Sequence, residues 1–116
     1  MKILVVDDEP LIRLGLAFEV GEWGYEVLEA ADADRAIALL EQHPDIRLVI
    51  TDVDMPGSMD GIRLAHFVRR RWPPIALIVI SGKLTDAEPQ LPAGSLFFEK
   101  PYPELQLRQA LAELTA

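Results

Sequence analysis

Residues 48–61 read LVITDVDMPGSMDG, and this stretch decides how the chain folds. The apolar run 48–50 is short, rich in β-branched residues, and typical of a strand that is covered on both faces of a parallel sheet. Carboxylates follow at once: Asp52 and Asp54 precede a Pro-Gly turn, and Asp60 comes after it. Because desolvation disfavours the ionised form of a carboxyl group, negative charge is costly at the end of a buried strand. This concentration of acids therefore needs a chemical explanation.

The rest of the chain supplies the partners that such a strand requires. Other short apolar runs bounded by turn-forming residues predict four further strands, at Ile3–Val6, Tyr25–Leu28, Ile75–Ile80 and Ser95–Phe98. Between them, apolar residues recur at helical spacing. These stripes are Ile12, Leu16, Val20 and Trp23; Ala36, Leu39 and Leu40; Ile62, Leu64, Ala65 and Val68; and Leu105, Leu107, Leu111 and Leu114.

The helix ends also carry recognisable signals. Asp32 or Asp34 is suited to cap the second helix, because a carboxylate there accepts free backbone N–H groups. Three arginines at 69–71 fall at the end of the next helix, where cations are favoured, so we interpret them as structural. Strand–helix alternation over residues 1–116 predicts a single α/β domain with a doubly wound parallel sheet. Pro89 and Pro92 leave room only for a shortened fourth helix, near 85–90.

Composition excludes several classes of function. The 116 residues carry a net charge of −8, which argues against direct nucleic-acid binding because that requires a basic face. The chain has no cysteine, so neither a disulfide nor a thiolate metal site is available. No apolar run has the length of a membrane span or a signal-peptide core. We expect a cytoplasmic protein that makes no membrane contact.

Polar side chains follow four of the predicted strands. Asp7 and Asp8 follow the first, Asp52 ends the third, Ser81 ends the fourth, and Lys100 follows the fifth. Functional groups of an open parallel sheet gather beyond the carboxyl ends of its strands, so these five side chains are predicted to converge. Clustered carboxylates suit Mg²⁺, a carboxylate can accept a phosphoryl group, and Lys and Ser can hold the phosphoryl oxygens.

These segments, VVDDEP, TDVDMPGSMDG, VISG and FFEKPY, together resemble the receiver domain of bacterial two-component response regulators. The resemblance covers essentially the whole chain and implies a flavodoxin-like sheet of five strands in the order 2-1-3-4-5. It assigns phosphorylation to Asp52, direct Mg²⁺ binding to Asp8, water-mediated binding to Asp7, and a third ligand to the backbone carbonyl of Asp54. By the same resemblance, Ser81 and Lys100 are the family's hydroxyl and lysine, Phe97 is its switch aromatic, and the Lys100–Pro101 bond is usually cis.

The implied function is signalling and not turnover of a separate substrate. A sensor histidine kinase or histidine phosphotransfer domain would phosphorylate Asp52 with Mg²⁺ as cofactor, and slow hydrolysis would reverse the reaction. The added charge would move Ser81 and turn Phe97 inward, changing the surface near the last strand and helix. Because the sequence starts with Met1 and ends just after a helix, we expect a stand-alone receiver without an output domain.

Several positions bear on partners and on the lifetime of the phosphorylated form. Leu11, Leu14 and Phe18 form a second apolar line on the first helix, where phosphotransfer domains dock in this family; with Pro101 they form the predicted partner surface. Asp54 and Lys83 occupy the positions that tune hydrolysis in receivers. Ser58 lengthens the loop after the acceptor, and Phe97 is not the more usual Tyr.

Two alternatives belong to other functional classes. Asp52-Val53-Asp54 also fits the opening of aspartate-nucleophile phosphohydrolases, but those enzymes place this sequence on their first strand and carry a cap domain. A receiver-like module that binds partners without phosphorylation would use the same fold, although here every position of the acceptor site is filled.

Overall fold

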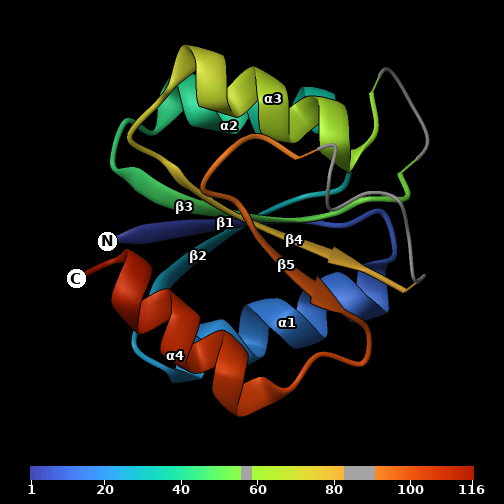
Figure 1. Cartoon of the computed structure of the whole chain (residues 1–116), viewed down its shortest axis with the longest axis vertical. Coiled ribbons are helices and arrows are strands. Elements are labelled where there is room, and N and C mark those ends of the chain that lie inside the picture. Colours follow the sequence, from blue (N-terminus) through green and yellow to red (C-terminus); the bar gives the residue numbers. More distant parts are fainter. Residues whose placement is uncertain (56–58, 83–90) are drawn as a thin grey trace.

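The sheet confirms the predicted architecture. The computed structural model describes residues 1–55, 59–82 and 91–116. Five parallel strands lie in the order β2-β1-β3-β4-β5 (Figure 1). The strands are β1 (Lys2–Val6), β2 (Glu26–Ala30), β3 (Ile46–Asp52), β4 (Ala76–Ser81) and β5 (Leu96–Glu99).

The strand register brings polar side chains to one edge of the sheet. Val6 of β1 lies level with Thr51 of β3, and Asp52 of β3 lies level with Ile80 of β4. Ser81 in turn pairs with Glu99, the last residue of β5. The residues that end or follow these strands therefore reach the same edge, as the sequence predicted.

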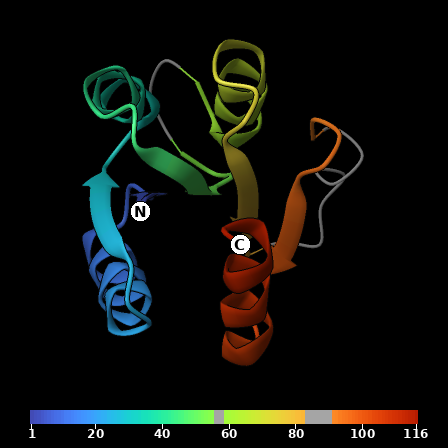
Figure 2. The same cartoon turned by 90° about the vertical axis from the view of Figure 1, so that its left-hand side faces the viewer.

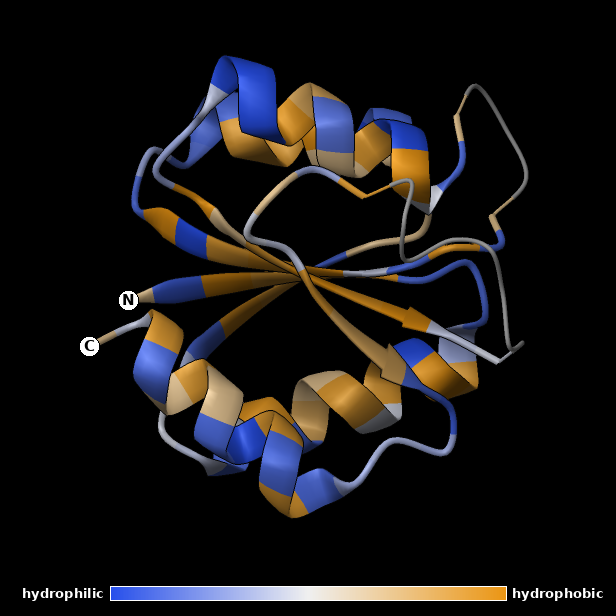
Figure 3. Ribbon diagram, viewed as in Figure 1, coloured by the Kyte–Doolittle hydropathy of each residue, from blue (hydrophilic) through white to orange (hydrophobic). Residues whose placement is uncertain are grey.

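Helices cover both faces of the sheet. The helices α1 (Pro10–Glu22) and α4 (Glu104–Leu114) lie on one face, and α2 (Ala33–Gln42) and α3 (Gly61–Arg71) lie on the other (Figures 1 and 2). This arrangement explains the continuous apolar runs, because each central strand buries side chains in both directions. In Figure 3 the strands are mostly orange through the middle of the sheet.

Two hydrophobic clusters result, one on each face. Alternate strand residues divide between them, so Leu4, Val49 and Leu77 pack beneath α2 and α3, while Ile3, Ile50 and Ile78 pack against α1 and α4. The central strands β1 and β3 are almost completely buried. They hold the acidic turns that follow them in fixed positions.

Helix ends agree with the local chemistry of the sequence. Asp32, and not Asp34, caps α2 by accepting a hydrogen bond from the backbone N–H of Arg35 at 2.8 Å. Asp60 caps α3 in the same way through Arg63, at 2.9 Å. The predicted structural role of the arginine cluster 69–71 is supported, because Arg69 donates to the carbonyls of Pro73 and Ile75.

Some details of the sequence interpretation were wrong. Ile12 and Leu105 are 36% and 66% exposed, although both belong to predicted core stripes. Trp23 lies just beyond α1 and not within it. The predicted helix at 85–90 and the inserted Ser58 lie outside the described residues. Within the described ranges, no helix is long and apolar enough to cross a membrane.

Candidate functional site

Three carboxylates meet at the carboxyl edge of the sheet. Asp52 ends β3 and is 8% exposed, whereas Asp7, directly after β1, is 4% exposed. Asp8 follows in the same turn and is partly exposed. One carboxylate oxygen from each of the three lies within 4.8 Å of the other two. The sequence predicted this convergence from the strand ends alone.

The lysine that follows β5 completes the cluster. Lys100 Nζ lies 3.4 Å from Asp52 Oδ1 and 3.7 Å from Asp7 Oδ2. The backbone N–H of Lys100 also donates to the carbonyl of Ser81 at 2.7 Å, which fixes the end of β5 against the end of β4. Ser81 is completely buried at this junction. The lysine ammonium thus lies beside two of the acids, and the buried Ser81 ends the strand next to β3.

The electrostatics of Asp52 follow from this crowding. Burial raises the pKa of the Asp52 carboxyl above its ordinary value, because desolvation penalises the charged form. The Lys100 ammonium opposes this change in pKa, whereas the negative charges of Asp7 and Asp54 add to it. Since burial and the two acids outweigh the lysine, a further cation beside Asp52 would be stabilising.

The donor set fits a hard divalent cation. All three converging groups offer carboxylate oxygens, the ligands that Mg²⁺ prefers. Asp8 faces partly outward, so an ion held there would remain accessible to water and to an incoming oxygen ligand. The residues present are therefore suited to a magnesium site.

Sequence reasoning missed the role of Gly61, the first residue of α3. A Cβ atom at this position would collide with the backbone carbonyl oxygen of Asp52. The N–H of Gly61 also donates to the carbonyl of Val53 at 3.0 Å. The helix thus begins directly against the end of β3. A Gly that follows a capping Asp was the available signal, but only the tertiary structure shows what it approaches.

The remaining predicted positions lie around this centre. Phe97 is half-buried on β5 and packs against the cluster beneath α2 and α3. Asp54 is exposed just beyond β3, and Pro101 follows a cis peptide bond. Lys83 lies outside the described residues.

The predicted partner surface on α1 does not belong to the carboxylate cluster. Leu11, Leu14 and Phe18 are 85%, 53% and 68% exposed. The second apolar line of α1 thus faces away from the core, and its role as a partner surface stays a prediction.

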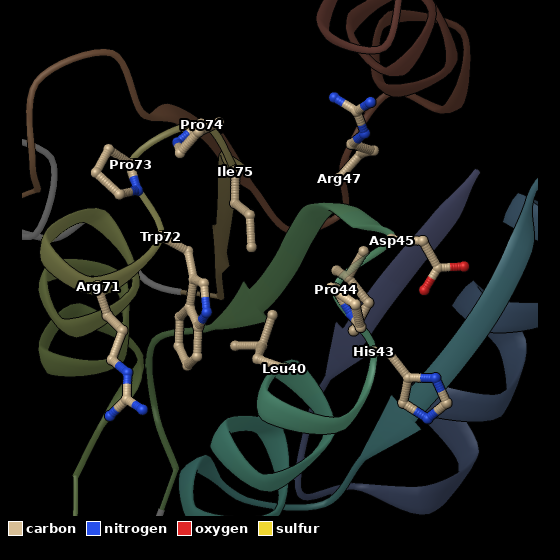
Figure 4. A pocket seen from close by; sticks show the side chains of 11 residues that line it. Leu40, His43, Pro44, Asp45, Arg47, Arg71, Trp72, Pro73, Pro74 and Ile75 are labelled. Carbon is tan, nitrogen blue, oxygen red and sulfur yellow. The ribbon is translucent and has the colours of Figure 1, made fainter.

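A large hollow lies elsewhere, along the segments that lead into β3 and β4 (Figure 4). Its volume is about 630 Å³, and its apolar lining includes Leu40, Trp72 and Ile75. The charges at its rim are largely paired within the chain, since Arg71 contacts Glu41 at 2.8 Å and Asp45 contacts Lys2 at 3.0 Å. The hollow therefore lacks the convergent acids that distinguish the carboxyl edge of the sheet.

Known proteins are similar to this chain in sequence and in fold. The model of the response regulator receiver domain matches residues 3–112. The "Glycerol metabolism activator" of Pseudomonas putida is 34% identical over 97% of this chain and 53% of its own length. The "Sensor kinase CckA" of Brucella abortus is also 34% identical over 97% of this chain, but over only 12% of its own length. The chain thus spans about half or less of these curated relatives.

Solved structures give the same result. The receiver domain of the hybrid histidine kinase CckA matches over 100% of both chains with a TM-score of 0.84 and 32% identity. A response regulator receiver protein from Sinorhizobium medicae matches 98% of this chain and 93% of its own, with a TM-score of 0.90 and 27% identity. Sequence, fold and the carboxylate cluster agree. The chain therefore belongs to the response regulator receiver domain family.

Proposed function

We propose that the protein receives a phosphoryl group on Asp52 from the phosphohistidine of a sensor kinase or histidine phosphotransfer domain, with Mg²⁺ as cofactor. The observation that carries the proposal is the position of the buried Asp52 carboxylate, between two further acids and the Lys100 ammonium. Asp52 oxygen attacks phosphorus, the phosphorus–nitrogen bond of the donor breaks, and the imidazole leaves. The product is an acyl phosphate on Asp52.

Other residues of the site have distinct roles in this proposal. Asp8 and Asp52 would hold Mg²⁺ directly, Asp7 would act through water, and the backbone carbonyl of Asp54 would supply the third protein ligand. When bound, the ion offsets the negative charge of the carboxylates and of the phosphoryl oxygens. Lys100 neutralises a phosphoryl oxygen, for which its present distance of 3.4 Å from Asp52 is suitable.

Phosphorylation then changes the surface of the protein. The new charge beside the buried Ser81 draws its hydroxyl towards the phosphoryl group as a hydrogen-bond donor. Phe97 turns inward into the space behind Ser81. Its half-buried position on β5, the strand next to β4, supports this coupling. The affected surface would therefore be that of β5 and α4.

The decisive test is formation of an acyl phosphate. Incubation with acetyl phosphate and Mg²⁺ should add one phosphoryl group, detectable by intact mass, and Asp52→Asn should abolish it. Turnover of p-nitrophenyl phosphate would instead indicate a phosphohydrolase. If neither acetyl phosphate nor a panel of histidine kinases modifies the protein, the unphosphorylated binding module becomes the better explanation.

The exposed apolar side chains of α1 are suited to the phosphodonor protein. Leu14 and Phe18 present apolar surface that is more than half exposed, and such surface often marks an interface. Leu14→Glu and Phe18→Glu should slow transfer from a phosphodonor protein at least tenfold. Acetyl phosphate is the matched control, because this small donor needs no docking surface and should react at the wild-type rate.

The lifetime of the acyl phosphate is proposed to depend on Asp54 and Lys83. Asp54 is exposed at the mouth of the site, where its carboxylate could pair with Lys83 and hinder attacking water. Lys83→Ala should then shorten the lifetime of phosphorylated Asp52. An unchanged lifetime would reject this pairing and leave two independent solvated charges.

A further inference from the structure

We propose that Arg13 is a positioning residue for the metal site, because it clamps the Asp7–Asp8 turn to the end of β2. The inference rests on the proposed function only in naming Mg²⁺ as the ion. Arg13 Nη1 donates to the backbone carbonyl of Asp7 at 2.9 Å, and Arg13 Nε contacts Glu29 Oε1 at 3.2 Å. The Arg13 side chain is only 17% exposed.

The clamp supplements a turn that is otherwise held by few contacts. The N–H of Asp7 donates to the carbonyl of Ala30 at 3.1 Å, and the N–H of Glu9 donates to Asp7 Oδ1 at 2.9 Å. Arg13 lies one helical turn after Glu9, with a backbone hydrogen bond of 2.9 Å between them. The guanidinium thus joins α1, the acidic turn and the neighbouring strand.

The peptide group that Arg13 holds sets the direction in which the Asp8 side chain leaves the backbone. The carbonyl of Asp7 belongs to the peptide unit leading into Asp8, so rotation of that unit would redirect the Asp8 side chain. In the described part of the chain, the Asp8 carboxylate makes no hydrogen bond or ion pair of its own. The range of positions open to the Asp8 carboxylate before metal binding therefore depends on the backbone, which Arg13 holds through the Asp7 carbonyl.

The position of Arg13 distinguishes this role from a simple charge effect. Over the described residues, its ion pair is with Glu29 and not with Asp7 or Asp8. If Arg13 acted through its positive charge, it would repel a metal ion and its removal would tighten Mg²⁺ binding. If it acts by holding the Asp7 carbonyl, its removal weakens Mg²⁺ binding. The two explanations predict opposite signs.

The experiment is a Mg²⁺ titration of the unphosphorylated protein, followed by calorimetry and by amide chemical shifts in the turn. Arg13→Ala should raise the Kd for Mg²⁺ about tenfold, the lower end of the range for groups that orient metal ligands. Arg13→Lys keeps the charge but cannot make both contacts, and should also weaken binding. Glu29→Gln leaves the bond to Asp7 and should have a smaller effect.

Arg35 provides the matched control. It lines the same small surface hollow as Arg13 and Glu29, and its side chain is exposed. Arg35→Ala removes an equal charge without touching the acidic turn, so its Kd for Mg²⁺ should remain at or below the wild-type value. The acetyl phosphate rate of Arg13→Ala should recover at saturating Mg²⁺, which separates metal binding from the acceptor chemistry.

Unchanged or tighter Mg²⁺ binding in Arg13→Ala would overturn the inference. If that variant fails to fold, Arg13→Lys decides, since a wild-type Kd there would equally reject the clamp. Failure of the proposed function has a different signature: the wild type would bind Mg²⁺ in an Arg13-dependent way but would form no acyl phosphate.

Discussion

Asp52 is held at a cost to the stability of the fold. Burial and its acidic neighbours raise the pKa of this carboxyl, so folding is opposed once Asp52 ionises. Without Mg²⁺, Asp52→Asn should therefore raise the unfolding temperature at pH 7. The gain should vanish below about pH 4, the ordinary range of an aspartate pKa, where the carboxyl is protonated in both states. Thermal denaturation across pH measures this directly.

Asp45 offers a control of opposite sign. Its hydrogen bond and ion pair with Lys2 lower the pKa of Asp45, so its ionised form favours the folded state above the ordinary pKa and loses this effect as the pH falls. Asp45→Asn should lower the unfolding temperature slightly at pH 7, with an effect that salt reduces because Asp45 is exposed. If Asp52→Asn and Asp45→Asn both raised the unfolding temperature, the cause would be the reduced net negative charge and not the burial of Asp52.

Gly61→Ala should disturb the end of β3, where Asp52 lies. An added Cβ would meet the carbonyl oxygen of Asp52, which is backbone and cannot turn aside, so α3 must shift. We expect a loss of roughly 1–3 kcal/mol in the free energy of unfolding, the range for overpacked sites, and slower phosphorylation of Asp52. Denaturant unfolding and acetyl phosphate kinetics measure the two effects.

Gly15→Ala in the middle of α1 is the matched control. A Cβ there meets nothing within 4 Å, so the substitution should stabilise the helix by roughly 0.5–1 kcal/mol. Destabilisation of both variants by the same amount would contradict the argument from close approach. Gly61 also shows where sequence reasoning stopped. Asp7, Asp8, Asp52, Ser81 and Lys100 could be predicted because each ends or follows a strand, whereas the requirement at Gly61 arises only when two separate segments pack.

At the scale of elements, burial made the strands recognisable but did not define their boundaries. The central strands β3 and β4 produce apolar runs because both of their faces are covered, and these runs predicted that the two strands exist. The predicted ranges of β2, β4 and β5 began one residue too early, and the run predicted for β3 omitted two residues at each end of that strand. Helical periodicity identified the faces of α1 and α4. It could not show how far along each face the sheet extends, so Ile12 and Leu105 were misassigned.

Tyr102 links the segment after β5 to α1. Tyr102 lies two residues after Lys100. Its hydroxyl donates a hydrogen bond to Glu19 Oε1 at 3.0 Å. Burial, followed by the nearby Glu19 carboxylate, raises the pKa of the Tyr102 phenol well above its usual value near 10. Because the folded state favours the neutral phenol, its contribution to stability is complete below pH 10 and is lost as the pH rises further.

Tyr102→Phe should therefore lower stability at pH 7 by about 1 kcal/mol, a typical hydrogen-bond contribution, and weaken the alkaline fall in unfolding temperature. Glu19→Gln retains a hydrogen-bond acceptor for the Tyr102 hydroxyl but removes the negative charge. It should therefore lower the stability at pH 7 by less than Tyr102→Phe does. An alkaline transition that is identical in wild type and Tyr102→Phe would show that another group controls it. NMR of the Tyr102 ring reports its ionisation independently.

Across the whole molecule, the two hydrophobic clusters on opposite faces of one sheet make the acidic edge a fixed feature of the fold. The residues that end β3 and follow β1 cannot separate without disturbing strands that are almost completely buried. The fold therefore keeps Asp7, Asp8 and Asp52 close together despite their mutual repulsion. Relief of that repulsion should raise the free energy of unfolding of the whole domain.

Mg²⁺ should consequently raise the unfolding temperature of the intact protein. A ligand that binds only the folded state at ten times its Kd contributes about 1.4 kcal/mol, which corresponds to a shift of roughly 5 °C for a domain of this size. The competing explanation is general screening of the net charge of −8. NaCl at matched ionic strength tests it, because screening would reproduce the shift without a specific site.

Variants locate the effect. Asp8→Asn should lose most of the rise in unfolding temperature with Mg²⁺, because it removes a proposed direct ligand. Asp45→Asn should keep that rise, because Asp45 lies in the turn before β3, at the opposite end of the strand from Asp52. Asp52→Asn should begin from a higher unfolding temperature and gain less, since its neutral side chain leaves less repulsion for the ion to relieve. An equal gain in Asp8→Asn and the wild type would place Mg²⁺ binding away from this cluster, whatever the result of the phosphorylation assay.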